Sequence, residues 1–156
     1  MIRQSGTSRN SAFTLVELVV VLALLGVVAV ASTSMLGGAR VVGSVRAGQE
    51  SQVLMQTLRM ARATAISSFV SVQVETIVEG RTVVGYRVLD PTGQLVGREY
   101  RFEPSVATNW STSAVTFMPT GATNTSLTVS FRGDSADWVV DLLSASGQVS
   151  ARKVAR

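Results

Sequence analysis

The chain has 156 residues, with 14 lysine and arginine residues against 10 aspartate and glutamate residues, for a formal net charge of +4. It contains no histidine and no cysteine, so the usual general base, the cysteine nucleophile, thiolate metal ligands and disulfide bonds are all excluded. We therefore expect neither an enzyme nor a bound cofactor or metal, and the small, acid-interleaved surplus of positive charge does not indicate a broad nucleic-acid-binding surface.

The first predicted element is a long apolar segment that begins beside a carboxylate. Residues 18–39 carry no charge, which is enough for one helix of about 20 residues to cross a bilayer. Glu17 stands at the edge of this segment, where an unpaired carboxylate costs on the order of a few kcal/mol if it enters hydrocarbon. An amino terminus created by cleavage just before Phe13 would compensate this charge. Arg3 and Arg9 precede the segment and favour a cytoplasmic N-terminus.

The start of the apolar segment reads Ala12-Phe13-Thr14-Leu15-Val16-Glu17-Leu18. This run resembles the processing site and N-terminal signature of type IV prepilins and type II secretion pseudopilins. The resemblance implies that a prepilin peptidase cuts before Phe13, that Phe13 is then N-methylated, and that Glu17 helps subunits to join a helical filament. The family's usual residue before the cut is glycine, and this chain has Ala12 in that place.

The same resemblance implies a division of the chain into three parts. Residues 1–12 are a leader peptide, residues 13–39 form a transmembrane and assembly helix, and residues 40–156 form a periplasmic pilin-like head. The subunit is then a single-pass protein of the bacterial inner membrane with a cytoplasmic N-terminus, and it moves to the tip of a pseudopilus or pilus on assembly.

A rival interpretation of the N-terminus is an ordinary secretory signal. Ala29-Val30-Ala31 forms an A-x-A pattern, so cleavage before Ser32 would release a secreted β-rich binding domain. Glu17 inside the would-be apolar region, and the order of residues around it, favour the prepilin interpretation.

Residues 13–68 are predicted to form one long helix, which becomes amphipathic after residue 39. The apolar stripe of its second half has residues at offsets of four, seven and eleven: Leu54, Leu58, Ala61 and Ala65. Arg59 and Arg62 lie off this stripe. We expect the stripe to pack on a β-sheet.

From residue 69 the hydrophobic period changes from helical to two, and turn residues recur at short intervals. The predicted strands are 69–75, 82–89, 95–102, 115–117, 127–131, 138–143 and 148–154. Asp90-Pro91-Thr92-Gly93 fits a type I turn, and the gap 104–114, which holds Trp110, is predicted to be an exposed loop. The fold class is therefore α+β, with a long N-terminal helix packed on an antiparallel β-sheet head.

Three further motifs resemble the GspH/FimT-like subgroup of this family. They are the helix end Leu58-x-x-Ala61-Arg62-x-x-Ala65, the turn Phe117-Met118-Pro119-Thr120-Gly121, and the strand start Gly147-Gln148-Val149, with Gln148 where an arginine is common. The resemblance implies a minor pseudopilin that helps to initiate or cap a type II secretion pseudopilus and supports protein export. Its implied partners are the peptidase, other minor and major pseudopilins or pilins, the inner membrane and secreted substrates.

The alternative within the same subgroup is a FimT-like minor pilin of a type IV pilus that binds DNA for uptake. The resemblance places the basic G-R-x-R motif of such pilins at residues 147–150, where this chain keeps only the glycine. The remaining candidates for DNA contact are Arg152, Lys153 and Arg156, with Arg98, Tyr100 and Phe102 as a candidate stacking face. Because acids lie beside these groups, DNA binding is the weaker expectation.

Two motifs that contain aspartate are expected to be structural rather than ligand-binding. Asp134, Asp137 and Asp141 lack the ligand-dense spacing of a calcium loop and are expected to be solvated acids of a turn and a strand edge. The tripeptide Arg132-Gly133-Asp134 is expected to be a tight turn between two strands.

Overall fold

The computed structural model describes residues 15–35 and 38–156, with side chains described for 15–27 and 43–156. The chain divides into two units after Gly38. The first contains α1 (Leu15–Met35), and the second contains α2 (Gly38–Ser68) and the strands. The helix predicted over 13–68 is confirmed for 15–35 and 38–68. Its residues 13, 14, 36 and 37, and the leader 1–12, lie outside the described residues.

Helix α2 buries one continuous stripe. Residues separated alternately by four and three positions are almost fully covered: Ala47, Ser51, Leu54, Leu58, Ala61 and Ala65. This spacing keeps all six side chains on one face of a helix, as the sequence predicted for the last four apolar positions. Ser51 is tolerated in the stripe because its hydroxyl donates to the Gly48 carbonyl at 2.8 Å, so no polar group is left unpaired.

The helix ends where Phe69 adopts a φ of +56°, in the left-handed region that commonly terminates helices. The predicted strand start at residue 69 is therefore wrong, and the first strand begins at Val72. The Phe69 side chain is 82% exposed. The alternation of residues 69–75 suggested a strand from Phe69, but the backbone of Phe69 belongs to the helix end.

The described head contains eight strands in two antiparallel sheets. One sheet has the order β3-β2-β1-β5 and the other β4-β6-β7-β8. The strands are β1 (Val72–Glu79), β2 (Thr82–Leu89), β3 (Tyr100–Arg101), β4 (Ala107–Trp110), β5 (Ala114–Phe117), β6 (Leu127–Arg132), β7 (Ala136–Leu142) and β8 (Val149–Ala155).

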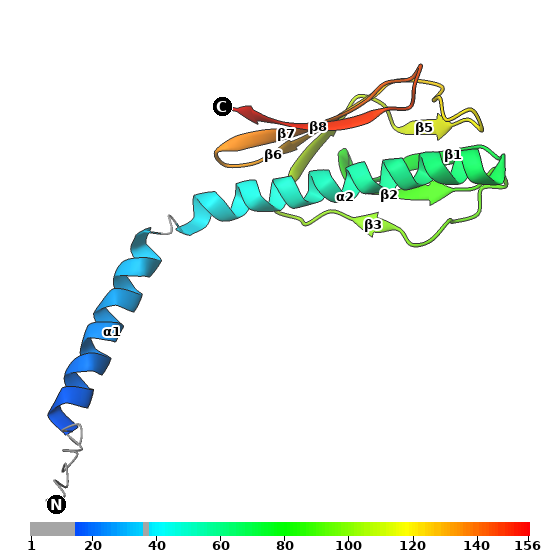
Figure 1. The fold of residues 1–156 in the computed structure, drawn as a ribbon. Helices are drawn as coiled ribbons and strands as arrows, with labels where there is room; N and C mark the ends of the chain where they lie inside the picture. The colour runs from blue at the N-terminus through cyan, green and yellow to red at the C-terminus, as the bar shows by residue number, and fades with distance from the viewer. Residues whose placement is uncertain (1–14, 36–37) are drawn as a thin grey trace, which may run out of the picture. The chain divides into compact units, whose positions relative to one another are not determined.

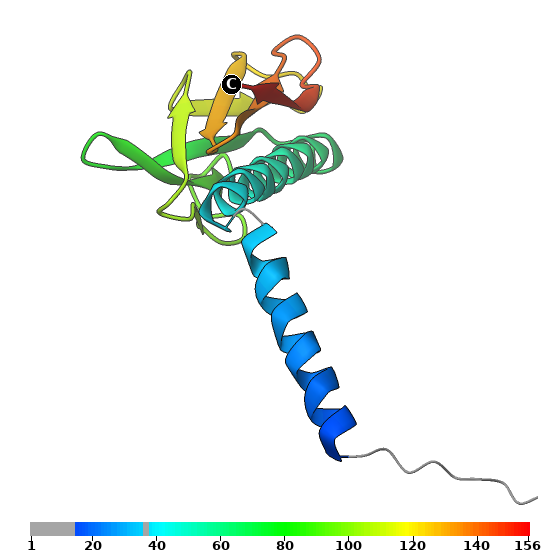
Figure 2. The ribbon, with the colours of Figure 1, turned by 90° about the vertical axis from the view of Figure 1, so that its left-hand side faces the viewer.

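In Figure 1, α2 lies with β6, β7 and β8 on one side and β3 on the other. Figure 2, viewed nearly along α2, shows the strands curving around one side of the helix. The predicted α+β class, a long helix packed on antiparallel strands, is confirmed.

The core fills the space between α2 and the two sheets. In β1 and β6, alternate residues are buried against the helix, as the period of two requires. Five aromatic rings gather at its centre with neighbouring centroids 5.2–6.3 Å apart: Tyr86, Tyr100, Phe102, Trp110 and Phe131. Such pairs stabilise a core beyond the area they bury.

This aromatic cluster corrects two predictions. The gap 104–114 is not an exposed loop, because it contains β4, which pairs with β6 and turns Trp110 towards the core. Tyr100 and Phe102 do not form a stacking face for nucleic acid, because Phe102 is buried and the ring of the partly buried Tyr100 stacks on Tyr86.

Candidate functional site

The N-terminal helix exposes apolar side chains in every direction. The side chains of leucine and valine at 15–27 are between 43% and 79% exposed in the single chain. A helix that is apolar all round requires cover from lipid or from other protein. Across the described ranges, neither helix meets the length and apolarity required of a candidate membrane span.

Glu17 lies in the first turn of α1 and is exposed. A carboxylate at this position is stabilised by the positive end of the helix dipole, by about 0.3–1 kcal/mol at an exposed site. Ala12 and Phe13, the predicted cleavage and methylation residues, lie outside the described residues. The structure therefore places Glu17 at the start of an uncovered apolar helix.

In the head, three sequence motifs that are far apart in the chain meet at one guanidinium. Arg62 Nε donates to the Gly121 carbonyl at 3.0 Å. Gly121 and Gly147 have φ of +82° and +61°, in the region that favours glycine, and a Cβ at Gly147 would collide with the Gly121 carbonyl oxygen. The Thr123 N–H donates to the Ser144 carbonyl at 2.8 Å, which joins the two glycine-containing turns.

This junction explains why the helix end, the Phe117–Gly121 turn and the Gly147 turn carry specific residues. The helix supplies a donor, one turn supplies the acceptor, and the other turn supplies a residue without a side chain. Sequence reasoning placed Arg62 off the apolar stripe but gave no partner for it. The two glycines are visible in the sequence as turn residues. The sequence does not show that they lie close to each other and to Arg62 in the fold.

A buried carboxylate joins α2 to β3 and the segment that follows it. Glu50 is only 8% exposed and accepts hydrogen bonds from the Tyr100 hydroxyl at 2.8 Å and the Glu103 N–H at 3.1 Å. Burial, together with the bond to Glu50, raises the pKa of Tyr100 above its usual value. Burial also raises the pKa of Tyr86 to about 12, although its hydrogen bond with Thr57 at 3.0 Å opposes the shift. Sequence reasoning missed this set, because no local pattern marks Glu50 as buried.

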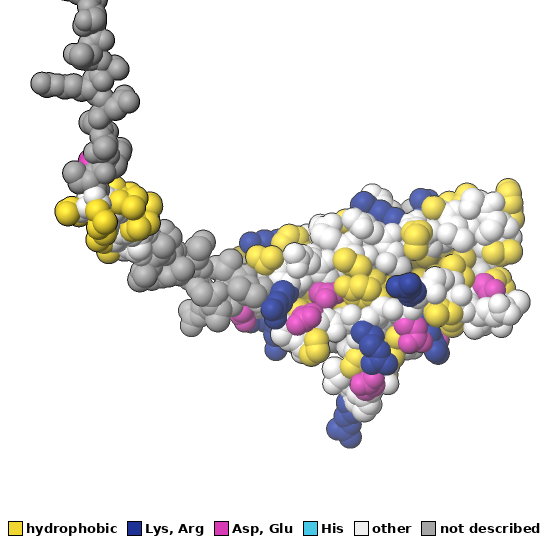
Figure 3. Space-filling view, turned by 90° about the horizontal axis from the view of Figure 1, so that it is seen from below, with side chains coloured by type: hydrophobic (Ala, Val, Ile, Leu, Met, Phe, Trp, Pro, Cys, Tyr) yellow, Lys and Arg dark blue, Asp and Glu magenta, His cyan; other side chains and the backbone are white. Residues whose placement is uncertain are grey.

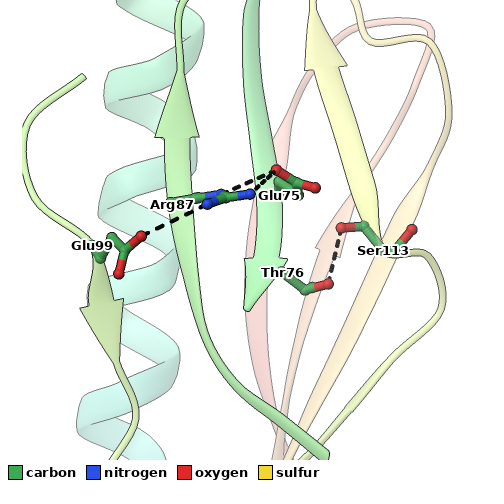
Figure 4. Close-up of polar contacts among 5 residues, drawn as sticks. All are labelled: Glu75, Thr76, Arg87, Glu99 and Ser113. Carbon is green, nitrogen blue, oxygen red and sulfur yellow. Dashed lines mark hydrogen bonds and ion pairs between the residues drawn. The ribbon is translucent and has the colours of Figure 1, made fainter. Parts of the chain in front are cut away.

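About half of the described charged side chains of the head form ion pairs. Arg87 lies between Glu75 at 3.0 Å and Glu99 at 3.8 Å, and Thr76 Oγ1 donates to the Ser113 carbonyl at 3.1 Å on the same sheet (Figure 4). The face shown in Figure 3 carries both signs of charge interspersed.

The predicted DNA-contact residues belong to this paired surface. Arg152 of β8 pairs with Asp141 of β7 at 3.2 Å, and Arg156, which follows β8, pairs with Asp137 of β7 at 2.9 Å. Lys153 lies apart from them, beside Trp138 in a groove along α2. The structure therefore does not bring the three cations together as one free cluster.

The acids near residue 134 are used within the fold. Arg132-Gly133-Asp134 connects β6 to β7, as the turn prediction requires, and Asp134 lies against Gly43 of α2. Asp137 and Asp141 form the ion pairs described above. Within the ranges that the structure describes, no group of three or more acids has an arrangement that could hold a metal ion.

Comparison with known proteins now gives the family. Residues 50–147 match the family model of type II transport protein GspH, and residues 7–33 match the prokaryotic N-terminal methylation motif. A comparison with curated proteins gives no match.

Solved structures show the same fold at low sequence identity. The type IV minor pilin FimU of Pseudomonas aeruginosa is 14% identical with a TM-score of 0.55, over 67% of this chain and 87% of that chain. The minor pseudopilin EpsH of the Vibrio cholerae type 2 secretion system is 15% identical with a TM-score of 0.55, over 70% of this chain and 97% of that chain. Because the GspH match spans more than half of the chain, this protein belongs to the family of type II transport protein GspH and is a pilin-like structural subunit.

Proposed function

We propose that this protein is a minor pseudopilin that helps to initiate or cap a type II secretion pseudopilus and so supports protein export. The observation that carries the proposal is α1, whose apolar side chains are exposed in all directions and whose first turn holds Glu17. This helix needs cover, and equivalent helices of neighbouring subunits supply it in a filament. The head belongs to a family named for type II transport.

Before assembly, residues 13–39 hold the subunit in the inner membrane with residues 40–156 in the periplasm. The uncharged stretch 18–39 and the match to the methylation motif support this location. Prepilin peptidase cuts between Ala12 and Phe13, and the new amino terminus is methylated. The Glu17 carboxylate then pairs with the methylated amine of Phe13, on the same subunit or a neighbour, which offsets the cost of placing a charge among apolar helices.

The Glu17 pairing predicts a specific defect in assembly. Glu17→Ala should be cleaved normally but should fall to background in the sheared filament fraction, because its helix lacks the charge that neutralises the amine of Phe13. The matched control is Glu79→Ala, which removes an exposed ion pair with Arg101 in the head and changes stability by less than about 1 kcal/mol. Immunoblots of membrane and filament fractions measure both steps. Normal incorporation of the Glu17 variant would contradict the proposed role.

The second candidate is a FimT-like minor pilin of a type IV pilus. The similarity to FimU, which equals that to EpsH in TM-score, supports this alternative. DNA uptake through Arg152, Lys153 and Arg156 is its finer form, and the ion pairs of both arginines weigh against it. Deletion of the gene separates the two machines, since loss of protein export with normal piliation supports the secretion role, and loss of pili supports the alternative.

A third candidate is a secreted β-rich binding domain released by cleavage after Ala31. The match to the methylation motif over residues 7–33 favours processing at Phe13 instead. The identity of the mature N-terminus decides between these two.

A further inference from the structure

A pocket of about 490 Å³ lies beside the junction at Arg62. Its walls are Arg59 and Arg62 of α2 and the turn of residues 146–149. Arg62 donates to the Gly121 carbonyl at 3.0 Å, and Arg59 Nη2 donates to the Val149 carbonyl at 3.4 Å. A guanidinium has five N–H donors, so these bonds orient each group and leave most of its donors available.

Neither of the two arginines forms an ion pair with an acid of the described head. Five other arginines do: Arg46, Arg87, Arg101, Arg152 and Arg156. Arg59 and Arg62 are also three residues apart on one helix, where like charges repel. An anion between them would relieve this repulsion.

The facing turn adds neutral donors to the pocket. Ser146 Oγ accepts the Gln148 N–H at 3.2 Å, so its hydroxyl proton remains available to an anion. Gln148 is exposed at the same rim and has an amide that can donate as well. Two planar guanidinium forks and two neutral donors suit a carboxylate, which accepts bidentate hydrogen bonds.

We propose that this pocket binds carboxylate side chains of an acidic segment in a partner protein. A nucleic acid would require a track of unpaired cations leading away from the pocket. The nearby basic strand does not provide one, because Arg152 and Arg156 are neutralised by Asp141 and Asp137. A site of two charges therefore fits one or two carboxylates better than a polyanionic backbone. This site goes beyond the filament role, which rests on α1.

The test uses the full-length chain in neutral detergent and a fluorescent peptide of consecutive glutamates, with inorganic phosphate and a single-stranded DNA oligonucleotide as competing probes. Arg59→Gln should weaken peptide binding by at least about tenfold, as loss of a charge-assisted hydrogen bond predicts. Arg81→Gln, the same change at an exposed arginine in the β1–β2 turn, should leave binding unchanged.

Arg62→Gln also removes the hydrogen bond to Gly121. Its peptide binding is therefore compared with that of the wild-type chain only after thermal unfolding shows that its head is folded. Equal weakening by Arg59→Gln and Arg81→Gln would mean non-specific attraction and would overturn the proposal. Failure of the wild-type chain to bind the peptide would do so as well. Tighter binding of the oligonucleotide than of the peptide, abolished by Arg59→Gln, would assign the pocket to nucleic acid instead.

Discussion

At the scale of single residues, Gly147 matters because of what it approaches. Its left-handed backbone would cost an alanine about 1–2 kcal/mol wherever it occurred. Here the missing side chain also makes room for the Gly121 carbonyl, which accepts a hydrogen bond from Arg62. Any side chain at Gly147 would therefore separate two turns and the helix end together.

We predict that Gly147→Ala lowers the free energy of unfolding by about 3 kcal/mol, because strain in the backbone adds to overpacking. The matched control is Gly93→Ala, since Gly93 has a φ of +81° and open space around its Cβ position. That variant should lose only the backbone part, about 1 kcal/mol. Urea unfolding followed by tryptophan fluorescence measures both values. Equal losses in the two variants would contradict the proposed collision.

At the scale of elements, α2 is joined to the sheet of β1, β2, β3 and β5 by two tyrosines. Tyr86 forms a hydrogen bond with Thr57, and Tyr100 donates to Glu50. Tyr100 must stay protonated to donate to the Glu50 carboxylate, and burial raises the pKa values of both phenols. The packing of α2 on this sheet is therefore sensitive to alkaline pH.

The pKa of Tyr86 is about 12 in the folded chain, against 10.0 for an ordinary tyrosine. Because the folded state holds its proton more tightly, the corresponding stability is fully present below pH 10 and is lost as the pH rises from 10 to about 12. Tyr86→Phe cannot titrate, so its unfolding free energy should fall less steeply over that range. Urea unfolding at stepped pH measures the slope. Identical slopes for the two proteins would show that Tyr86 does not carry the effect.

The elements also show which parts of the fold were predictable. β2 has the predicted bounds because it lies between two clear turns. β4 was missed, because its four residues only alternate between exposed and partly buried, and its pairing with β6 is a long-range contact. The predicted strand 95–102 shrinks to two residues of β3, with Leu95 forming an isolated bridge to Leu89.

The same distinction holds for the sites. Glu17 and Phe13 are proposed from a local motif, which the sequence alone contains. The partner of Arg62 depends on two turns that are 26 residues apart and meet only in the folded head, as Gly121 and Gly147 show. The strand prediction began too early, at Phe69, because the alternating pattern of residues 69–75 does not show that Phe69 has a left-handed backbone.

At the scale of the whole molecule, the two units differ in what they present to their surroundings. The described part of α1 presents apolar side chains in all directions, with one acid in its first turn. The described head presents charges of both signs, many of them in ion pairs, around a closed core. The first suits lateral association of helices, and the second suits an aqueous compartment. This division supports a filament subunit whose assembly depends on the N-terminus.

Processing at Phe13 is the step on which the filament role depends. N-terminal sequencing and intact-mass analysis of the protein isolated from bacterial membranes test it directly. We predict a mature chain that begins at an N-methylated Phe13 and lacks residues 1–12. A mature chain that begins at Ser32, or one that retains the leader, would contradict the account.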